Sequence, residues 1–205
     1  MKKSVFLLGD SISIHYNPYL IPATEQFDWM TKKGRAEALK DLDKPIGENG
    51  GTSRACLEFL RDEEARDALH YDYLLFNCGL HDIVYEGGKT TPRVDAGDYH
   101  KNLTEIVELA QSHGIRPIWI STTPVDDERH NTKASFLRHN EHVLLYNAIA
   151  KEVMSRHKVP TIDLYTFTVA LGKDIYADHV HYIDEVRRLQ AAFIREKLLV
   201  TTIND

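Results

Sequence analysis

The stretch Ser4-Val5-Phe6-Leu7-Leu8-Gly9-Asp10-Ser11-Ile12 decides the fold. An apolar run leads directly into Gly-Asp-Ser, which is typical of a buried strand that ends in a sharp turn. Ligands bind at the carboxyl edge of open α/β sheets, and this turn would place Ser11 at that edge. A helix that begins after Ser11 would add N–H groups and a positive dipole end beside the hydroxyl. Ser11 is therefore a candidate nucleophile, although on this stretch alone a helix N-cap is the more common role.

The composition is that of an ordinary globular chain, and the 205 residues fit a single domain spanning 1–205. The net charge is −6 and the charges are interspersed, so no basic block indicates nucleic acid or an anionic membrane surface. No apolar stretch reaches transmembrane length, and the N-terminus lacks the pattern of a secretory signal. With Met1 as the natural start, we expect a cytoplasmic protein. The two cysteines, Cys56 and Cys78, are then expected to be reduced and buried rather than joined in one disulfide.

Strands and helices are expected to alternate along the chain. Besides the first strand, we expect strands at 36–42, 73–77, 116–121 and 159–164. A helix from Ser13, interrupted at Pro18, is expected to resume through Trp29, and others are expected at 54–69, 101–113, 142–157 and from Asp184 onward. The segments 86–99 and 126–140 are polar and are expected to be loops. Connections of this length suit right-handed crossovers, which predicts a parallel sheet with helices on both faces.

Two further turns carry glycine and polar residues. In Asn49-Gly50-Gly51-Thr52-Ser53 the glycines allow backbone to approach a ligand closely, and Thr52 or Ser53 is expected to cap the next helix. By themselves these glycines are more commonly turn residues. The second turn, Cys78-Gly79-Leu80-His81-Asp82, follows a continuous apolar strand and so also lies at a carboxyl edge.

An acid and a histidine lie close together near the end of the chain. Asp178 precedes His181 by three residues in a loop, so that carboxylate and imidazole can pair, and Ser11 is the natural nucleophile for that pair. His179 is the alternative base, but the spacing from Asp178 favours His181. Zinc bound by Asp178, His179 and His181 would lack the spaced cysteines or the His-Glu-x-x-His helix of established sites, so we expect no metal.

Four blocks in order resemble the SGNH hydrolase superfamily, also called the GDSL esterase/lipase family. They are Gly9-Asp10-Ser11-Ile12, Asn49-Gly50-Gly51-Thr52-Ser53, Gly79-Leu80-His81-Asp82 and Asp178-His179-Val180-His181. The resemblance implies a three-layer α/β/α, flavodoxin-like fold with a five-stranded parallel sheet, and a serine hydrolase that needs no cofactor. It assigns Ser11 as nucleophile, His181 as general base, and Asp178 as the group that orients the imidazole.

The resemblance also implies an oxyanion hole. Its donors would be the N–H of Ser11, the N–H of Gly50 with Gly51 as the competing register, and the side chain at position 81. The family has asparagine where this chain has His81, which can still donate a hydrogen bond. The remaining candidates for support or substrate contact are Asp10, which would brace the turn, Asn77 as reserve donor, Asp82, Arg54 and Arg138. For the two arginines, a surface role is the more common alternative.

The predicted function is hydrolysis of a small-molecule carboxylic ester. The loops expected to rim the site (49–53, 83–95 and 125–140) are polar, which favours a short acyl group, such as acetyl on a sugar or another polar alcohol. One alternative is a flavodoxin-like ligand-binding module without catalysis, although the glycine loop lacks the Lys-Ser/Thr ending of a P-loop. Another is a degenerate hydrolase, because of His81. A homo-oligomer is compatible with the sequence, which leaves the oligomeric state and the natural substrate open.

Overall fold

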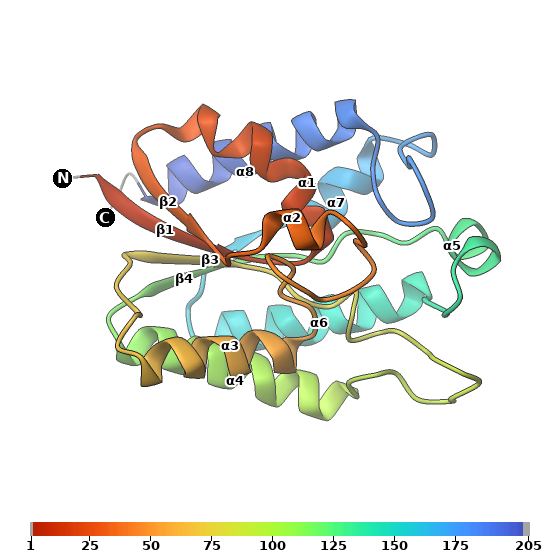
Figure 1. Ribbon diagram of the computed structural model, residues 1–205, viewed down its shortest axis with the longest axis horizontal. Coiled ribbons are helices and arrows are strands. Elements are labelled where there is room, and N and C mark those ends of the chain that lie inside the picture. The colour runs from red at the N-terminus through yellow and green to blue at the C-terminus, as the bar shows by residue number, and fades with distance from the viewer. Residues whose placement is uncertain (1, 203–205) are drawn as a thin grey trace.

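The computed structural model describes residues 2–202. Within them, one all-parallel sheet has the strand order β2-β1-β3-β4-β5. The strands are β1 (Lys3–Leu8), β2 (Phe27–Thr31), β3 (Tyr73–Phe76), β4 (Arg116–Ile120) and β5 (Thr161–Ile162). Helices lie on both faces of this sheet (Figure 1), which confirms the three-layer α/β/α class.

Each face of the sheet is covered by its own set of helices (Figure 1). On one face lie α1 (Ser11–Leu20), α7 (Leu164–Ala170) and α8 (Asp184–Thr202), with α8 packed against the other two. On the other face lie α3 (Ser53–Ala65), α4 (Ala96–Ser112) and α6 (Asn140–Arg156), packed in that order. The short elements are η1 (Pro22–Thr24), α2 (Arg35–Ala38) and α5 (Asp127–Lys133). Because the central strand β3 is covered on both sides, all of its residues are buried, which explains its continuous apolar sequence.

Several helices begin where a side chain caps their first turn. Asp10 accepts the N–H of Ile12 at the start of α1, and Thr52 accepts the N–H of Ala55 at the start of α3. The expected cap at Thr52 is thus confirmed. The two cysteines are free and buried. No helix in the stretch 2–202 combines the length and the apolar character that crossing a membrane requires.

The prediction of a helix broken at Pro18 and continuing through Trp29 is wrong. Helix α1 runs through Pro18, which lacks the N–H that would bond to the Ile14 carbonyl. The guanidinium of Arg35 donates to that carbonyl instead, at 2.8 Å, so the missing backbone bond is replaced from another segment. Trp29 lies in strand β2, and the stretch 36–42 predicted as a strand contains part of α2.

The β2 strand has a recognisable signal in hindsight. Phe27 is buried and Trp29 half-buried, whereas Asp28 and Met30 between them are exposed. This alternation is expected of an edge strand, and β2 pairs only with β1. Three smaller predictions also change. Part of the loop 86–99 belongs to α4, the polar stretch 126–140 contains α5, and the last strand is only Thr161–Ile162. It is short because Asp163 caps α7 immediately afterwards.

Candidate active site

Ser11 is the first residue of α1, directly after the turn that ends β1. Asp10 holds this turn through two hydrogen bonds, since its carboxylate accepts the N–H of Ile12 at 2.9 Å and its carbonyl accepts the Ser13 hydroxyl at 2.6 Å. Burial raises the pKa of Asp10, although the bond from Ile12 opposes that shift. A Cβ atom at Gly9 would lie 2.8 Å from the Ser13 side chain, so only glycine fits the turn. Ser11 is therefore fixed at the carboxyl edge of the sheet.

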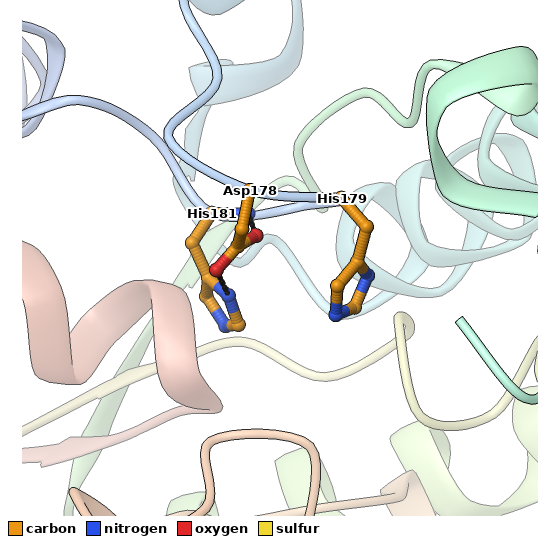
Figure 2. A group of neighbouring side chains, drawn as sticks. All are labelled: Asp178, His179 and His181. Carbon is orange, nitrogen blue, oxygen red and sulfur yellow. Dashed lines mark hydrogen bonds and ion pairs between the residues drawn. The ribbon is translucent and has the colours of Figure 1, made fainter. Parts of the chain in front are cut away.

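The loop after α7 brings a histidine and an aspartate to this serine. The Nε2 atom of His181 lies 2.8 Å from Ser11 Oγ, although 170 positions separate the two residues. The other ring nitrogen, Nδ1, lies 2.8 Å from Asp178 Oδ2 (Figure 2). The second carboxylate oxygen of Asp178 accepts the backbone N–H groups of Val180 and His181. The expected convergence of the two loops is present.

Electrostatics set the direction of this hydrogen-bonded chain. Burial works against the charge of Asp178, but hydrogen bonds from the His181 ring and from two backbone N–H groups outweigh it and hold the pKa of the carboxyl below its ordinary value. An ionised carboxylate only accepts, so the Nδ1 atom of His181 carries the proton that it donates to Asp178. In the neutral ring, Nε2 then presents its lone pair to the Ser11 hydroxyl. This arrangement allows proton transfer from the serine to the histidine.

The ring of His179, the alternative base, lies to one side of the bonded pair of Asp178 and His181 (Figure 2). Its Nδ1 atom is 2.9 Å from Nδ1 of His130, and its Nε2 atom is 3.0 Å from an oxygen of Asp43. Both ring nitrogens are thus engaged with side chains other than the serine. The structure brings His181, and not His179, to the candidate nucleophile.

Asp178, His179 and His181 also form the one group that meets the geometric requirement for a metal site within residues 2–202 (Figure 2). Each offers one ligand atom, and these atoms lie within 4.8 Å of one another. However, both ring nitrogens of His181 already contact Asp178 and Ser11. An ion bound through His181 would have to displace one of those contacts.

The two candidate glycine donors are engaged elsewhere in this structure. The Gly50 N–H donates to the Gly9 carbonyl at 2.8 Å, and the Gly51 N–H donates to Oδ1 of Asn49 at 3.0 Å. A Cβ atom at Gly50 would lie 3.1 Å from the Gly9 carbonyl oxygen, so glycine allows these two turns to pack closely. The expectation that one of these N–H groups is free to face an oxyanion does not hold here. The Ser11 N–H has no partner within α1, because it is the first residue of the helix.

His81 lies at the third candidate position, with 2% of its surface exposed. Its Nδ1 atom is buried without a hydrogen-bond partner. Burial, followed by the positive charge of Arg138, lowers the pKa of His81 to about 3. The ring is therefore neutral at neutral pH and has one N–H to donate.

The other candidate residues have structural contacts. Asn77 donates to the Ile120 carbonyl at 2.8 Å, so its amide is not available as a reserve donor. Asp82 accepts the N–H and the hydroxyl of Ser53 and fixes the start of α3. Arg54 forms an exposed ion pair with Asp98 between α3 and α4. None of these contacts is with Ser11 or His181.

Comparisons with known proteins agree with this geometry. The sequence profile of the GDSL-like lipase/acylhydrolase family matches residues 7–188. The chain belongs to this family. Among solved structures, a lipase/acylhydrolase from Enterococcus faecalis is 17% identical, with a TM-score of 0.71 over 98% of this chain and 97% of that one. The acetyl xylan esterase AlAXEase is 16% identical, with a TM-score of 0.68 over 97% and 99%.

A third similar structure is the psychrotrophic esterase EstA from a Pseudoalteromonas species, inhibited by monoethylphosphonate. It is 14% identical, with a TM-score of 0.65 over the full length of both chains (100% and 100%). No curated protein sequence matches this chain. At these identities, the solved structures show that the chain has the GDSL/SGNH fold.

This GDSL-family chain also has residues near Ser11 that sequence analysis missed. His15 follows Ser11 by one helical turn, and its ring contacts the His181 ring at a centroid distance of 5.0 Å. Their spacing of four residues on one helix is the signal that could have found it. His130 is also buried, and it lies on the short helix α5, where no periodicity marks it. Arg138, a sequence candidate for substrate contact whose more common role is at the surface, is buried as well.

The candidate nucleophile and the candidate base of this GDSL-family chain are both buried. Only 5% of Ser11 and 2% of His181 is exposed. His179 connects the segments around them, through Asp43 on one side and His130 on the other. Little of the candidate nucleophile and of the candidate base is therefore accessible in this structure.

Proposed function

We propose that this protein is a serine esterase that works through an acyl-enzyme. The observation that carries the proposal is the chain from Ser11 Oγ to His181 Nε2 and from His181 Nδ1 to Asp178, with 2.8 Å at each step. These three side chains lie at the carboxyl edge of a parallel sheet, where ligands bind in folds of this class. The family to which the protein belongs is one of acylhydrolases. Ser11 is the proposed nucleophile, His181 the general base, and Asp178 the group that orients the ring.

The proposed reaction has two halves. Ser11 Oγ attacks the ester carbonyl carbon while His181 Nε2 takes the hydroxyl proton. When the tetrahedral intermediate collapses, the bond to the leaving oxygen breaks and His181 gives its proton to that alcohol. A water activated by His181 then attacks the acyl-enzyme and releases the acid. Asp178, anionic throughout, stabilises the imidazolium that forms in each half.

The oxyanion of each intermediate needs hydrogen-bond donors. We assign the Ser11 N–H, which has no partner in α1, and the side chain of His81, whose Nδ1 atom has none either. With the Gly50 N–H bonded to Gly9, this hole has fewer evident donors than the family pattern. A missing donor typically costs on the order of 10²–10³ in turnover, so we expect modest rates unless Gly50 is released when substrate binds.

A short acyl group on a polar alcohol is the proposed substrate class. Its support is the polar sequence of the surrounding segments and the low exposure of Ser11 and His181. The similarity to an acetyl xylan esterase agrees with this size of acyl group. Hydrolysis of 4-nitrophenyl acetate should be faster than that of the palmitate ester, and the reverse ranking would remove this substrate class but not the mechanism.

A fluorophosphonate probe tests the mechanism directly. We expect the wild type to be labelled at Ser11, Ser11→Ala not to be labelled, and ester hydrolysis to disappear with the label. Ser53→Ala, another buried serine at a helix start, controls for labelling elsewhere. An unlabelled wild type that binds a nucleotide or flavin tightly would support a non-catalytic module. Full labelling with negligible turnover would indicate a degenerate hydrolase.

A further inference from the structure

Arg138 is a buried cation that forms no ion pair with a residue in the stretch 2–202, although the charges of Asp43 and Asp10 act on it. It is 2% exposed, yet its side chain has only one hydrogen bond, from Nε to the Leu80 carbonyl at 2.7 Å. The Nη1 group is buried and unpartnered, and Arg138 takes part in none of the ion pairs formed within residues 2–202. A guanidinium carries five N–H donors, so most of the donors of Arg138 are unused.

The position of Arg138 is nevertheless well defined. Its backbone N–H donates to the Asn131 side chain at 3.0 Å, and its guanidinium lies 4.8 Å from the centroid of the Phe136 ring. Burial lowers the pKa of Arg138 to about 10, which leaves the side chain charged at neutral pH. The charges of Asp43 and Asp10 offset only part of the cost of burying this cation, which suggests that a further partner arrives with a ligand.

Two histidines with unpartnered nitrogens lie within the electrostatic reach of Arg138. One is His81, whose backbone neighbour Leu80 bonds to Arg138, and the other is His130 on α5. The Nδ1 atom of His81 and the Nε2 atom of His130 are buried without partners. Burial comes first and the Arg138 charge second among the causes that lower the pKa of His81 to about 3 and that of His130 to about 4.

Nearby carboxylates do not account for the unused donors. Asp43 is engaged with His179 at 3.0 Å. Asp10 uses one oxygen for the Ile12 N–H, and its other oxygen is buried with no partner, so it is not bonded to Arg138. Asp43 and Asp10 thus attract the arginine charge through space, but neither carboxylate bonds to it, and the two histidine rings beside it are neutral. The unused N–H groups of Arg138 are therefore available to a small anion.

We propose that Arg138, together with His130, binds a carboxylate of the ester substrate. His81 keeps its single N–H for the oxyanion. The natural substrate would then be an ester of an acidic molecule rather than a neutral one. The bidentate geometry of a guanidinium suits a carboxylate, and the buried setting strengthens a charge-assisted bond. The inference rests on the proposed esterase function and narrows its substrate class. The chain's net charge of −6 repels such a substrate, and a local cation offsets that repulsion.

Matched pairs of aryl esters test the charge preference on each side of the scissile bond. For the acyl side, mono-4-nitrophenyl glutarate is compared with 4-nitrophenyl butyrate. For the alcohol side, 4-acetoxybenzoate is compared with phenyl acetate, and enzyme-free rates are subtracted throughout. We expect the wild type to favour the carboxylate ester in at least one pair by about tenfold or more in kcat/KM. A wild type that favours the neutral ester in both pairs overturns the proposal.

Variants of Arg138 assign the preference to this residue. Arg138→Met keeps most of the length of the side chain and removes the charge, so the ratio of kcat/KM for the carboxylate ester to that for the neutral ester should fall by about tenfold or more. Arg138→Lys keeps a positive charge and should retain part of the preference for the carboxylate ester. Lys133→Met, which removes an exposed cation of α5, should behave as the wild type. If Arg138→Met lowers kcat/KM for the carboxylate ester and the neutral ester equally, Arg138 does not bind the substrate carboxylate.

A melting experiment separates anion binding from a purely structural role. Glutarate, titrated against sodium chloride of equal ionic strength, should raise the Tm of the wild type but not that of Arg138→Met. If Arg138 only balances the charges of Asp10 and Asp43, the variant will melt lower and glutarate will have no effect on the wild type. If fluorophosphonate labelling and neutral-ester hydrolysis persist without any charge preference, this inference fails alone. If labelling of Ser11 also fails, the esterase function fails with it.

Discussion

The ring of His15 packs edge-on against the ring of His181, with the two centroids 5.0 Å apart. Helix α1 therefore supplies both the candidate nucleophile, Ser11, and a support for the candidate base. Burial comes first, and the neighbouring charge of His181 second, among the causes that lower the pKa of His15 to about 3. The supporting ring is thus neutral at neutral pH and does not oppose the charge that His181 gains in the reaction.

This packing predicts that His15 is a positioning residue. His15→Ala should lower kcat by about tenfold, because the His181 ring loses a contact that fixes its angle toward Ser11 Oγ. His15→Phe keeps an aromatic ring in place and should restore most of the rate with KM unchanged. Steady-state kinetics on both variants check this, and equal losses in the two would argue against a packing role.

The hydrogen bond between Asp178 and His181 predicts a large loss of kcat when the Asp178 carboxylate is replaced by an amide. Asp178→Asn keeps the shape but allows the wrong tautomer of the imidazole, and we expect kcat to fall by about 10⁴-fold with the fold intact. Asp174→Asn, in the same loop but exposed, is the matched control and should retain full activity. Circular dichroism confirms folding. A loss below tenfold in Asp178→Asn would show that Asp178 does not orient the base.

His81 stands where the family has asparagine, and two variants test whether its side chain stabilises the oxyanion. His81→Asn restores the side chain typical of the family and should retain or raise kcat, whereas His81→Ala should lower it by on the order of 10². Initial rates on 4-nitrophenyl acetate measure both. A collapse of His81→Asn with the fold intact would mean that the histidine has a role that an amide cannot take over.

Much of the central fold could be predicted from local sequence. Strands β1, β3 and β4 are apolar runs because both faces of the sheet are covered, and such runs are visible without a structure. The edges could not be predicted as well. Strand β2 is half exposed, so its apolar pattern is weak. Pro18 predicts a break because it lacks an N–H. The helix is nevertheless continuous, since Arg35 bonds to the carbonyl left without a partner, and that contact forms only in the folded chain.

The candidate site likewise has parts that the sequence predicts and parts that it does not. Ser11 and His181 were expected to meet because the carboxyl ends of parallel strands share one rim, and the structure places them together, while their roles remain predictions. The engagement of the Gly50 N–H with Gly9 depends on how two turns pack, which no local pattern specifies. Arg138 is polar and lies next to a short helix, so its sequence context suggests exposure, and only the folded chain shows that it is buried.

The contacts of the candidate triad predict independence from metal ions. Both ring nitrogens of His181 are engaged with protein groups, so proton transfer from Ser11 needs no bound ion. Prolonged treatment with EDTA followed by desalting should leave kcat/KM for 4-nitrophenyl acetate unchanged. Restoration of a lost activity by Zn²⁺ would instead favour the cluster of Asp178, His179 and His181 as a metal site.

The buried carboxyl of Asp82 predicts an unusual dependence of stability on pH. Burial raises its pKa from 3.8 to about 7, although hydrogen bonds from Ser53 oppose the shift. A group whose pKa is raised in the folded state stabilises the fold fully below its unfolded pKa and loses that contribution as pH rises through the folded value. For Asp82, the loss falls between about pH 4 and pH 7 and is on the order of 4 kcal/mol.

Asp82→Asn isolates this contribution, because the amide is neutral at every pH and its oxygen can still accept the Ser53 N–H. We expect the variant to be less stable than the wild type at pH 5 and to approach or exceed it at pH 8. Urea unfolding at a series of pH values measures the difference, which should change most near pH 6. Buried His81 and His130 titrate in the opposite direction over part of this range, but they are common to both proteins and cancel in the comparison. A difference between the two proteins that stays constant from pH 5 to pH 8 would mean that Asp82 remains ionised in the folded state throughout.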